Sequence, residues 1–418
     1  MTLILNIKQE IDRSVQQWHE QLGQDIVPLG QGIRNVQYTT EALDLIFQKG
    51  LPDDPVEEVL FKLNAYLYML QIVVQPVQNQ LSRTMSSLGY HTHLAVAELQ
   101  KSIESLFAEP LPLTSTITTA QREWLSGTLS YIRIEMLSEA RDSFTFFNSY
   151  MRIWINWILP IWKDSSAKET QSLLQAELQL LEKLEPRSSH SALKQAWWLA
   201  QSYIHFEHGA DHDEVALALI HTAATKQDFY PDRLPDYLER LTEHADWQRL
   251  AYWLTKLADV LRQQQSNLQN YASYWEQVIA ELPEAESQMW TALEKLLPVG
   301  GRIYEEKLLA YGKWQLWMDY QLSAGNDPAN YKVTELQPLE NNAPEMLLPF
   351  YHQAVERHMA HKNRQGYKAA VKLLKRLAKL YKKIKQEPRW NDFIEHFAQR
   401  NSRLRALQEE LRKGKLIP

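Results

Sequence analysis

Residues 367–385 read YKAAVKLLKRLAKLYKKIK. At about 100° per residue, the apolar side chains gather on one side of a helix, at Val371, Leu374, Leu377, Leu380, Tyr381 and Ile384. The cations gather elsewhere, within an arc of about 120°: Lys368, Lys372, Lys375, Arg376, Lys379, Lys382 and Lys383. The stretch therefore predicts an amphipathic helix whose apolar side packs on a folded body.

The same helical spacing recurs along the rest of the chain. Near the amino terminus, apolar residues follow one another at steps of three or four, at Ile7, Ile11, Val15, Trp18 and Leu22. No segment shows the alternation that is typical of a strand. We expect further helices at 39–48, 55–80, 91–107, 120–162, 168–183, 189–206 and 213–225. The sequence thus predicts an all-α protein.

A Trp-led pattern recurs in the second half of the chain. Apolar residues stand at positions 0, 3, 4 and 7 from Trp247, and again from Trp275 and Trp390. Such stripes are buried when helix pairs stack in a solenoid, although any buried amphipathic helix has this spacing and no tetratricopeptide consensus is satisfied. We predict an irregular helical bundle at residues 1–164 and a TPR-like helix-pair α-solenoid at residues 165–418, ending in a basic amphipathic segment.

Composition excludes several kinds of chemistry and location. The 418 residues include no cysteine, so the chain forms no disulfide, thiolate zinc site or thiolate nucleophile. The amino-terminal residues do not form a signal-peptide pattern, and the most apolar stretches, Tyr66–Val77 and Ile153–Trp162, are too short to span a bilayer. We therefore expect a cytoplasmic protein without a membrane partner.

Charge is distributed unevenly between the body and the carboxyl end. The chain has a formal net charge of −6, with 45 Lys and Arg against 51 Asp and Glu. Residues 351–418 hold 18 Lys and Arg against 6 Asp and Glu, a net of +12, which leaves 27 against 45, a net of −18, before them. This asymmetry predicts that the basic end meets a polyanion or an acidic partner.

Three interpretations of the basic face of residues 367–385 remain open. Nucleic acid, either DNA or RNA, fits because phosphate neutralisation is additive and needs no fixed geometry. An acidic surface of this chain or of a second protein fits as well, and a merely solvated face is the third interpretation. Like charges four residues apart repel by a few tenths of a kcal/mol per pair, which favours an anionic partner.

Motifs for catalysis are not found in the sequence. Neither a Gly-x-Ser-x-Gly elbow nor a phosphate-binding glycine loop occurs. His205, His208 and His212, with nearby acids, are candidate ligands for a metal with nitrogen and oxygen ligands, or simply a His-rich turn between two helices. We expect no enzymatic activity and no cofactor.

Several segments carry a resemblance to a known family. Residues 367–377, 390–397 and 402–416 read YKAAVKLLKRL, WNDFIEHF and SRLRALQEELRKGKL. They resemble the C-terminal helical region of bacterial SWIM zinc-finger proteins, found chiefly in Firmicutes. Residues 88–93, LGYHTH, and the helix with Trp154 and Trp157 are similar to the part that follows the finger in that family.

The resemblance does not extend to the zinc finger itself. The family's zinc-binding element is Cys-x-Cys…Cys-x-His, and this chain has no cysteine with which to build it. Either the finger has been removed or this homologue has lost it, so zinc is not carried over. The resemblance implies an intracellular bacterial protein that works beside a Swi/Snf-type helicase, on DNA or as an adaptor to it.

Taken together, these features predict a binding protein. We expect a non-catalytic scaffold or adaptor that binds nucleic acid, or a helicase subunit that processes nucleic acid, through the basic C-terminal helix. The alternatives are a protein–protein adaptor without direct nucleic-acid contact and a metal-dependent hydrolase that uses the three histidines.

Overall fold

The computed structural model describes residues 13–30, 34–74, 89–114, 116–138, 145–162, 167–186, 191–225, 229, 234–263 and 268–418. Across these residues all regular secondary structure is helical, which confirms the all-α prediction. The chain divides into two compact units, Met1–Val260 and Leu261–Pro418. The boundary predicted after residue 164 falls inside the first unit and stays a prediction.

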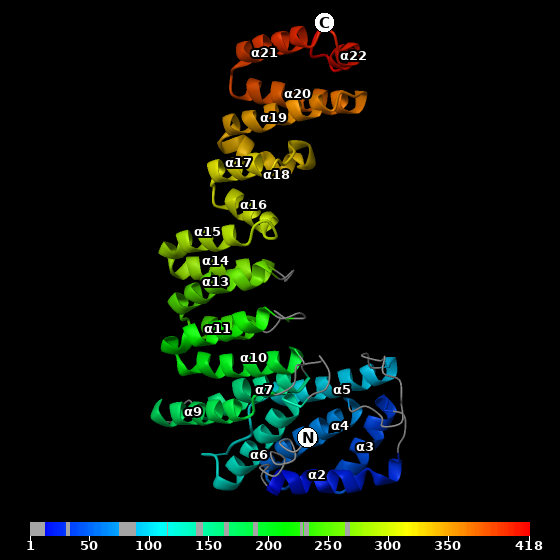
Figure 1. Cartoon of the computed structure of the whole chain (residues 1–418), viewed down its shortest axis with the longest axis vertical. Coiled ribbons are helices and arrows are strands. Elements are labelled where there is room, and N and C mark those ends of the chain that lie inside the picture. Colours follow the sequence, from blue (N-terminus) through cyan, green and yellow to red (C-terminus); the bar gives the residue numbers. More distant parts are fainter. Residues whose placement is uncertain are drawn as a thin grey trace. The chain divides into compact units, whose positions relative to one another are not determined.

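The first unit begins as a bundle around a central apolar helix and continues with paired helices (Figure 1). Its elements are α2 (Arg13–Asp25), η2 (Val27–Leu29), α3 (Val36–Gln48), α4 (Pro55–Val74), α5 (Tyr90–Phe107), α6 (Thr119–Met136), α7 (Thr145–Ile153), the π-helical η3 (Trp154–Ile158), α8 (Leu159–Trp162), α9 (Ala167–Lys183), α10 (Ser191–His208), η4 (Ala210–His212), α11 (Asp213–Ala224), α12 (Leu234–Glu243) and α13 (Trp247–Arg262), whose last residues belong to the second unit. Helix α4 is apolar nearly all round because α2, α3, α5 and α6 all pack on it.

The predicted helix at 120–162 is wrong as a single element. Helix α6 ends at Met136, residues 137 and 138 form a turn, and α7 begins at Thr145 and packs back on α6. Residues 137–144 contain neither proline nor glycine, so no punctuating residue marks the break. Apolar periodicity continues across it because both helices bury their apolar sides in the same bundle. The end of the predicted helix 55–80, residues 75–80, lies outside the described residues.

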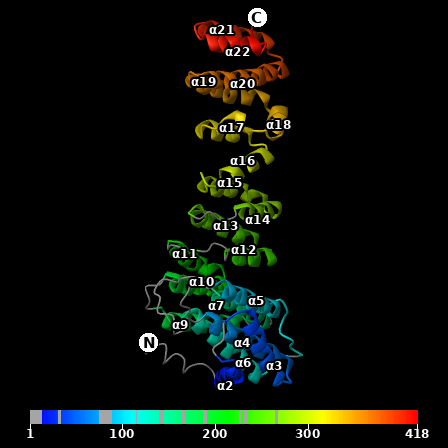
Figure 2. The same ribbon diagram turned by 90° about the vertical axis from the view of Figure 1, so that its right-hand side faces the viewer.

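The second unit is a succession of short helices that pack on their neighbours (Figure 2). Its elements are α14 (Leu268–Glu281), η6 (Pro283–Ala285), α15 (Glu286–Lys295), α16 (Gly301–Ala310), α17 (Trp314–Ser323), η7 (Pro328–Asn330), α18 (Val333–Asn342), η8 (Pro344–Met346), α19 (Leu347–Ala360), α20 (Arg364–Lys383), α21 (Glu387–Arg400) and α22 (Arg405–Lys413). Helix α16 packs on α17, α17 on α19, and α20 on α19, α21 and α22. This packing agrees with the predicted helix-pair array.

Tryptophans anchor the helix packing. Trp253, Trp275 and Trp317 are completely buried, and the Trp-led stripe that begins at Trp390 buries Ile394 and Phe397. Trp247 is only half-buried, while Leu250, Ala251 and Leu254 of its stripe are buried. Aromatic side chains of this size remove the most apolar surface from water, so these residues serve the core.

Candidate functional site

Helix α20 carries the candidate site, and its start is fixed by two local features. The side chain of Asn363 caps the helix, with its Oδ1 accepting a hydrogen bond of 2.8 Å from the amide of Gly366. A Cβ at position 366 would lie only 2.5 Å from the carbonyl oxygen of His358 in α19. Glycine therefore allows α19 and α20 to approach closely, and both views show the two helices side by side (Figures 1 and 2).

The two sides of α20 differ as the sequence predicts. Tyr367, Val371, Leu374, Leu377, Leu380 and Tyr381 are buried. Six cations of the predicted face are exposed and one is half-buried, in the order Lys368, Lys372, Lys375, Arg376 (half-buried), Lys379, Lys382 and Lys383. We call these seven residues the basic face. The structure brings all of them to the outer side of one helix, as expected from their angular positions.

Five lysines of the basic face are electrostatically uncompensated. Lys368, Lys372, Lys375, Lys379 and Lys382 form no ion pair with any residue that the structure describes. Elsewhere in residues 351–418 several cations are neutralised, because Arg364 pairs with Glu409 and Glu410, Arg400 with Glu356, and Lys413 with Glu410. Six exposed cations outside the basic face also form no ion pair with a described residue: Lys362, Lys385, Arg389, Arg403, Arg405 and Lys415. The basic face is distinguished by the alignment of its free charges along a single helix.

The spacing of these cations makes the basic face repulsive to itself. Lys368 and Lys372, Lys375 and Lys379, and Lys379 and Lys383 are like-charged pairs four residues apart. Each such pair destabilises a helix by about 0.2–0.5 kcal/mol. From Lys368 to Lys382 the face extends about 21 Å, since an α-helix rises about 1.5 Å per residue. An elongated anion would relieve this repulsion.

The other two cations of the basic face are held in place by uncharged acceptors. Arg376 donates from Nη1 to the carbonyl oxygen of Pro328 in η7 at 3.1 Å, and Lys383 donates to Oδ1 of Asn341 in α18 at 2.8 Å. Neither acceptor carries a charge, so both side chains keep their positive charge while their positions are restricted. Such restriction is a form of preorganisation for binding.

A pocket opens beside these two residues. It has a volume of about 190 Å³ and is lined by Glu340, Tyr351, Arg376, Lys379, Leu380 and Lys383. Glu340 belongs to α18 and Tyr351 to α19, so three helices contribute. The sequence analysis did not identify Glu340 or Tyr351, because their proximity to α20 arises only when the helices pack.

The three candidate metal ligands lie together at the α10–α11 turn. The Nδ1 atoms of His205 and His212 are 3.2 Å apart, and the ring centroids of His208 and His212 are 4.7 Å apart. Burial lowers the pKa of His205 and of His208, and the neighbouring His212 adds to the effect. However, among the described residues no group of three His, Cys, Asp or Glu side chains is arranged to hold a metal ion.

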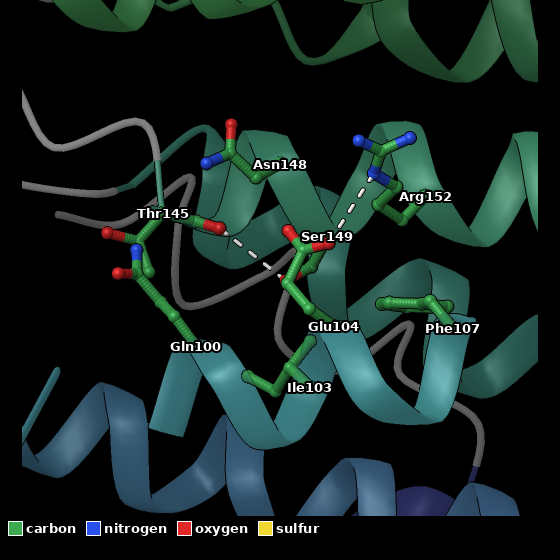
Figure 3. Close-up of a pocket in the computed structure, with 8 residues that line it drawn as sticks. All are labelled: Gln100, Ile103, Glu104, Phe107, Thr145, Asn148, Ser149 and Arg152. Atoms are coloured by element: carbon green, nitrogen blue, oxygen red, sulfur yellow. Dashed lines mark hydrogen bonds and ion pairs between the residues drawn. The ribbon is translucent and has the colours of Figure 1, made fainter. Parts of the chain in front are cut away.

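A second pocket, in the first unit, was not predicted from the sequence. It lies between α5 and α7, has a volume of about 130 Å³ and is shown in Figure 3. Arg152 approaches Glu104 at 3.7 Å and Asp236 at 3.9 Å, and the Oδ1 atom of Asn148 is buried without a hydrogen-bond partner. Its lining is mostly polar: α7 contributes Thr145, Asn148, Ser149 and Arg152, and α5 contributes Gln100 and Glu104 beside the apolar Ile103 and Phe107. It contains no nucleophile and base in hydrogen-bond contact.

No helix in the described part of the chain is both long enough and apolar enough to cross a membrane.

Comparisons with known proteins give one partial match. No protein-family model and no solved structure matches the chain. Among curated proteins, it is 30% identical over 204 residues to a Bacillus subtilis (strain 168) protein described as "Uncharacterized protein YwqB". The match covers 45% of this chain and 38% of the Bacillus protein, so the chain spans less than two fifths of the length of this relative. The chain is therefore similar to part of a larger protein.

Proposed function

We propose that this chain is a non-catalytic scaffold or adaptor whose basic face binds the phosphates of nucleic acid. One observation carries the proposal: five exposed lysines on one side of α20 have no carboxylate partner among the described residues. A charged face that repels itself is stabilised when an anion neutralises it. Nucleic acid supplies such anions at regular intervals.

The dimensions of the basic face suit a nucleic-acid strand. A duplex places one phosphate per about 3.4 Å of axis on each strand, so a face about 21 Å long extends over about six nucleotide steps. Lysine presents a compact ammonium on a flexible stem, which follows a phosphate backbone without demanding a particular base. The proposed binding is therefore independent of sequence and sensitive to salt.

The competing proposal is a protein–protein adaptor. Residues 1–350 carry a net formal charge of −18, so an acidic protein surface could satisfy the same lysines. The resemblance to SWIM zinc-finger proteins suggests a Swi/Snf-type helicase as the partner in either case. A helicase subunit that co-purifies with the chain after nuclease treatment would favour the adaptor, whereas loss of the association after nuclease treatment would favour nucleic acid.

Charge reversal on the basic face tests the proposal directly. The variant with Lys372→Glu, Lys375→Glu, Lys379→Glu and Lys382→Glu should lose binding to DNA in gel-shift titrations, while its helical circular dichroism stays unchanged. A matched control reverses four exposed cations elsewhere, Lys101, Lys168, Lys183 and Arg262. This control changes the net charge by the same amount but leaves the basic face intact. It should therefore bind DNA far better than the first variant.

Three results would contradict the proposal. The first is that wild-type protein fails to bind DNA or RNA of either strandedness at about 50 mM salt, where electrostatic binding is strong. The second is that both variants lose affinity equally, because the overall charge and not the basic face would then control binding. Retention of full affinity by the α20 variant would place the contact elsewhere.

A further inference from the structure

We propose that the pocket lined by Tyr351, Arg376, Lys379 and Lys383 binds the terminal phosphate of a nucleic-acid strand. The inference rests on the proposed function, because it assigns a place on the basic face to one end of the bound strand. It differs from that function in kind. The open part of the face would contact backbone phosphates anywhere along a strand, whereas the pocket would recognise an end.

Two of the pocket cations are held in place by uncharged groups of other helices. Within the described part of the chain, Arg376 and Lys383 are the two residues of the basic face that donate hydrogen bonds to other helices, and both line the pocket. Their acceptors are a backbone carbonyl and an amide oxygen, which fix position without neutralising charge. A guanidinium has five N–H donors and an ammonium three, so each keeps donors for a ligand.

The pocket lining is positively charged. Three cations and the carboxylate of Glu340 give a formal charge of +2 (+3 − 1). A backbone phosphodiester carries one negative charge, whereas a terminal phosphate carries about −1.5 to −2 at neutral pH and offers three strong acceptor oxygens. The charge of a terminal phosphate therefore balances that of the pocket, and its three oxygens can accept hydrogen bonds from the three cations.

The pocket lining also contains two other polar groups, the Tyr351 hydroxyl and the Glu340 carboxylate. Burial raises the pKa of Tyr351, against the opposing effect of the nearby Arg376 guanidinium, so its hydroxyl stays protonated and can donate at neutral pH. Glu340 can only accept. A nucleotide provides sugar hydroxyl or base amino hydrogens for it, whereas an Asp or Glu side chain of an acidic protein provides none.

The pocket also has room for more than a bare ion. Its volume of about 190 Å³ is more than ten times the roughly 10–15 Å³ that a single water requires. A phosphate and part of its sugar are of the right scale. The pocket opens at the side of α20 where Lys379 continues into the exposed lysines, so a strand that starts in the pocket can run along the basic face.

The test compares oligonucleotides that differ only at one end. Single strands of about twelve nucleotides with a 5′-phosphate, a 3′-phosphate or only hydroxyl ends are titrated against the full chain by fluorescence anisotropy. A phosphate at the recognised end should tighten binding by about tenfold, the value of one additional charge-assisted contact. This preference should vanish in Lys379→Gln and in Lys383→Gln.

A matched control and a gain-of-affinity variant complete the test. Lys372→Gln removes one charge outside the pocket, so it should weaken binding of all three strands equally and keep the preference. Glu340→Gln removes the negative charge of the only carboxylate in the pocket lining but keeps an acceptor oxygen, so it should strengthen the preference for the phosphorylated end. Lys372 is exposed and Glu340 is half-buried, so both variants should keep the helical circular dichroism of the wild-type protein.

The outcomes separate this inference from the function on which it rests. If wild-type protein binds all three strands equally, the pocket assignment is overturned while nucleic-acid binding stands. If no strand binds, both fail. A preference that survives in Lys379→Gln and Lys383→Gln would also overturn the assignment, and so would a preference that is lost in Lys372→Gln.

Discussion

At the scale of single residues, His19 illustrates how a half-buried polar group is accommodated. Its Nε2 atom lies 3.1 Å from Oδ1 of Asn64, whose Nδ2 donates to Oγ1 of Thr128 at 2.8 Å, and Thr128 in turn donates to the carbonyl of Trp124. Burial lowers the pKa of His19 to about 4, although the hydrogen bond to Asn64 opposes this shift. The folded protein therefore favours the neutral imidazole.

This lowered pKa predicts a loss of stability in mild acid. Above pH 6.5 the histidine is neutral in the folded and in the unfolded protein, so its contribution to the free energy of unfolding is fully present. Between pH 6.5 and about 4 the unfolded protein binds the proton preferentially, so the free energy of unfolding falls as the pH falls. The lowering of this pKa from 6.5 to about 4 corresponds to a loss of up to about 3 kcal/mol in the free energy of unfolding. The urea concentration at the unfolding midpoint should decrease more between pH 7 and pH 4.5 in the wild-type protein than in the His19→Gln variant. Equal drops would contradict this role of His19.

Residues that act through their own helix were predictable, and residues that act across helices were not. The seven cations of the basic face were found because their angles on one helix follow from the sequence alone. Asn64 and Thr128 are 64 positions apart, and Glu340 and Tyr351 reach α20 only through packing. Their residue types at those spacings match no motif, so the sequence held no signal for either group.

At the scale of elements, a buried ion pair connects three helices of the first unit. Arg133 of α6 forms a bidentate pair with Glu177 of α9, at 2.7 Å and 2.6 Å, and Tyr150 of α7 donates to the same carboxylate at 2.9 Å. Arg133 and Glu177 are 5% and 3% exposed. All donors converge on one carboxylate, so removing that charge leaves a buried cation uncompensated.

The ion pair predicts an asymmetry between single and double substitution. Glu177→Gln should lower the unfolding free energy of the first unit by about 3–5 kcal/mol, whereas replacing both Arg133 and Glu177 with leucine should cost much less. Urea unfolding of the full chain, followed by far-ultraviolet circular dichroism, measures both.

An exposed pair provides the control for this prediction. Arg302 and Glu306 form an i,i+4 pair at 3.0 Å with side chains 88% and 49% exposed, so Glu306→Gln should change stability by less than about 1 kcal/mol. If Glu177→Gln and Glu306→Gln had similar effects, the buried pair would not hold the three helices together.

Elements could be predicted well where a sequence marks their ends. Helix α20 extends over Arg364–Lys383 against the expected 367–385, with Asn363 as its cap. The break between α6 and α7 was missed because its residues contain neither glycine nor proline and apolar spacing continues on both sides. Periodicity reports which side of a helix is buried, and it does not report where the chain reverses.

At the scale of the whole molecule, the acidic body contrasts with the basic carboxyl end. The net charges of −18 and +12 were evident from the sequence. The second unit refines this picture, because Arg364, Arg400 and Lys413 pair internally while five lysines of α20 have no ion-pair partner among the described residues. Exposed cations without an ion pair to a described residue also occur elsewhere in the tail, at Lys362, Lys385, Arg389, Arg403, Arg405 and Lys415. Helix α20 is thus the part of the tail where five such cations share one face of a single helix.

The salt dependence of DNA binding measures how many phosphates the basic face neutralises. If the five uncompensated lysines each neutralise one phosphate of a duplex, the logarithm of the association constant should fall against the logarithm of salt concentration with a slope of about −4.5. Reversing Lys372, Lys375, Lys379 and Lys382 should abolish measurable binding across the same salt series. A slope near zero for wild type, or an equal slope for wild type and this variant, would contradict the assignment of the basic face to nucleic acid.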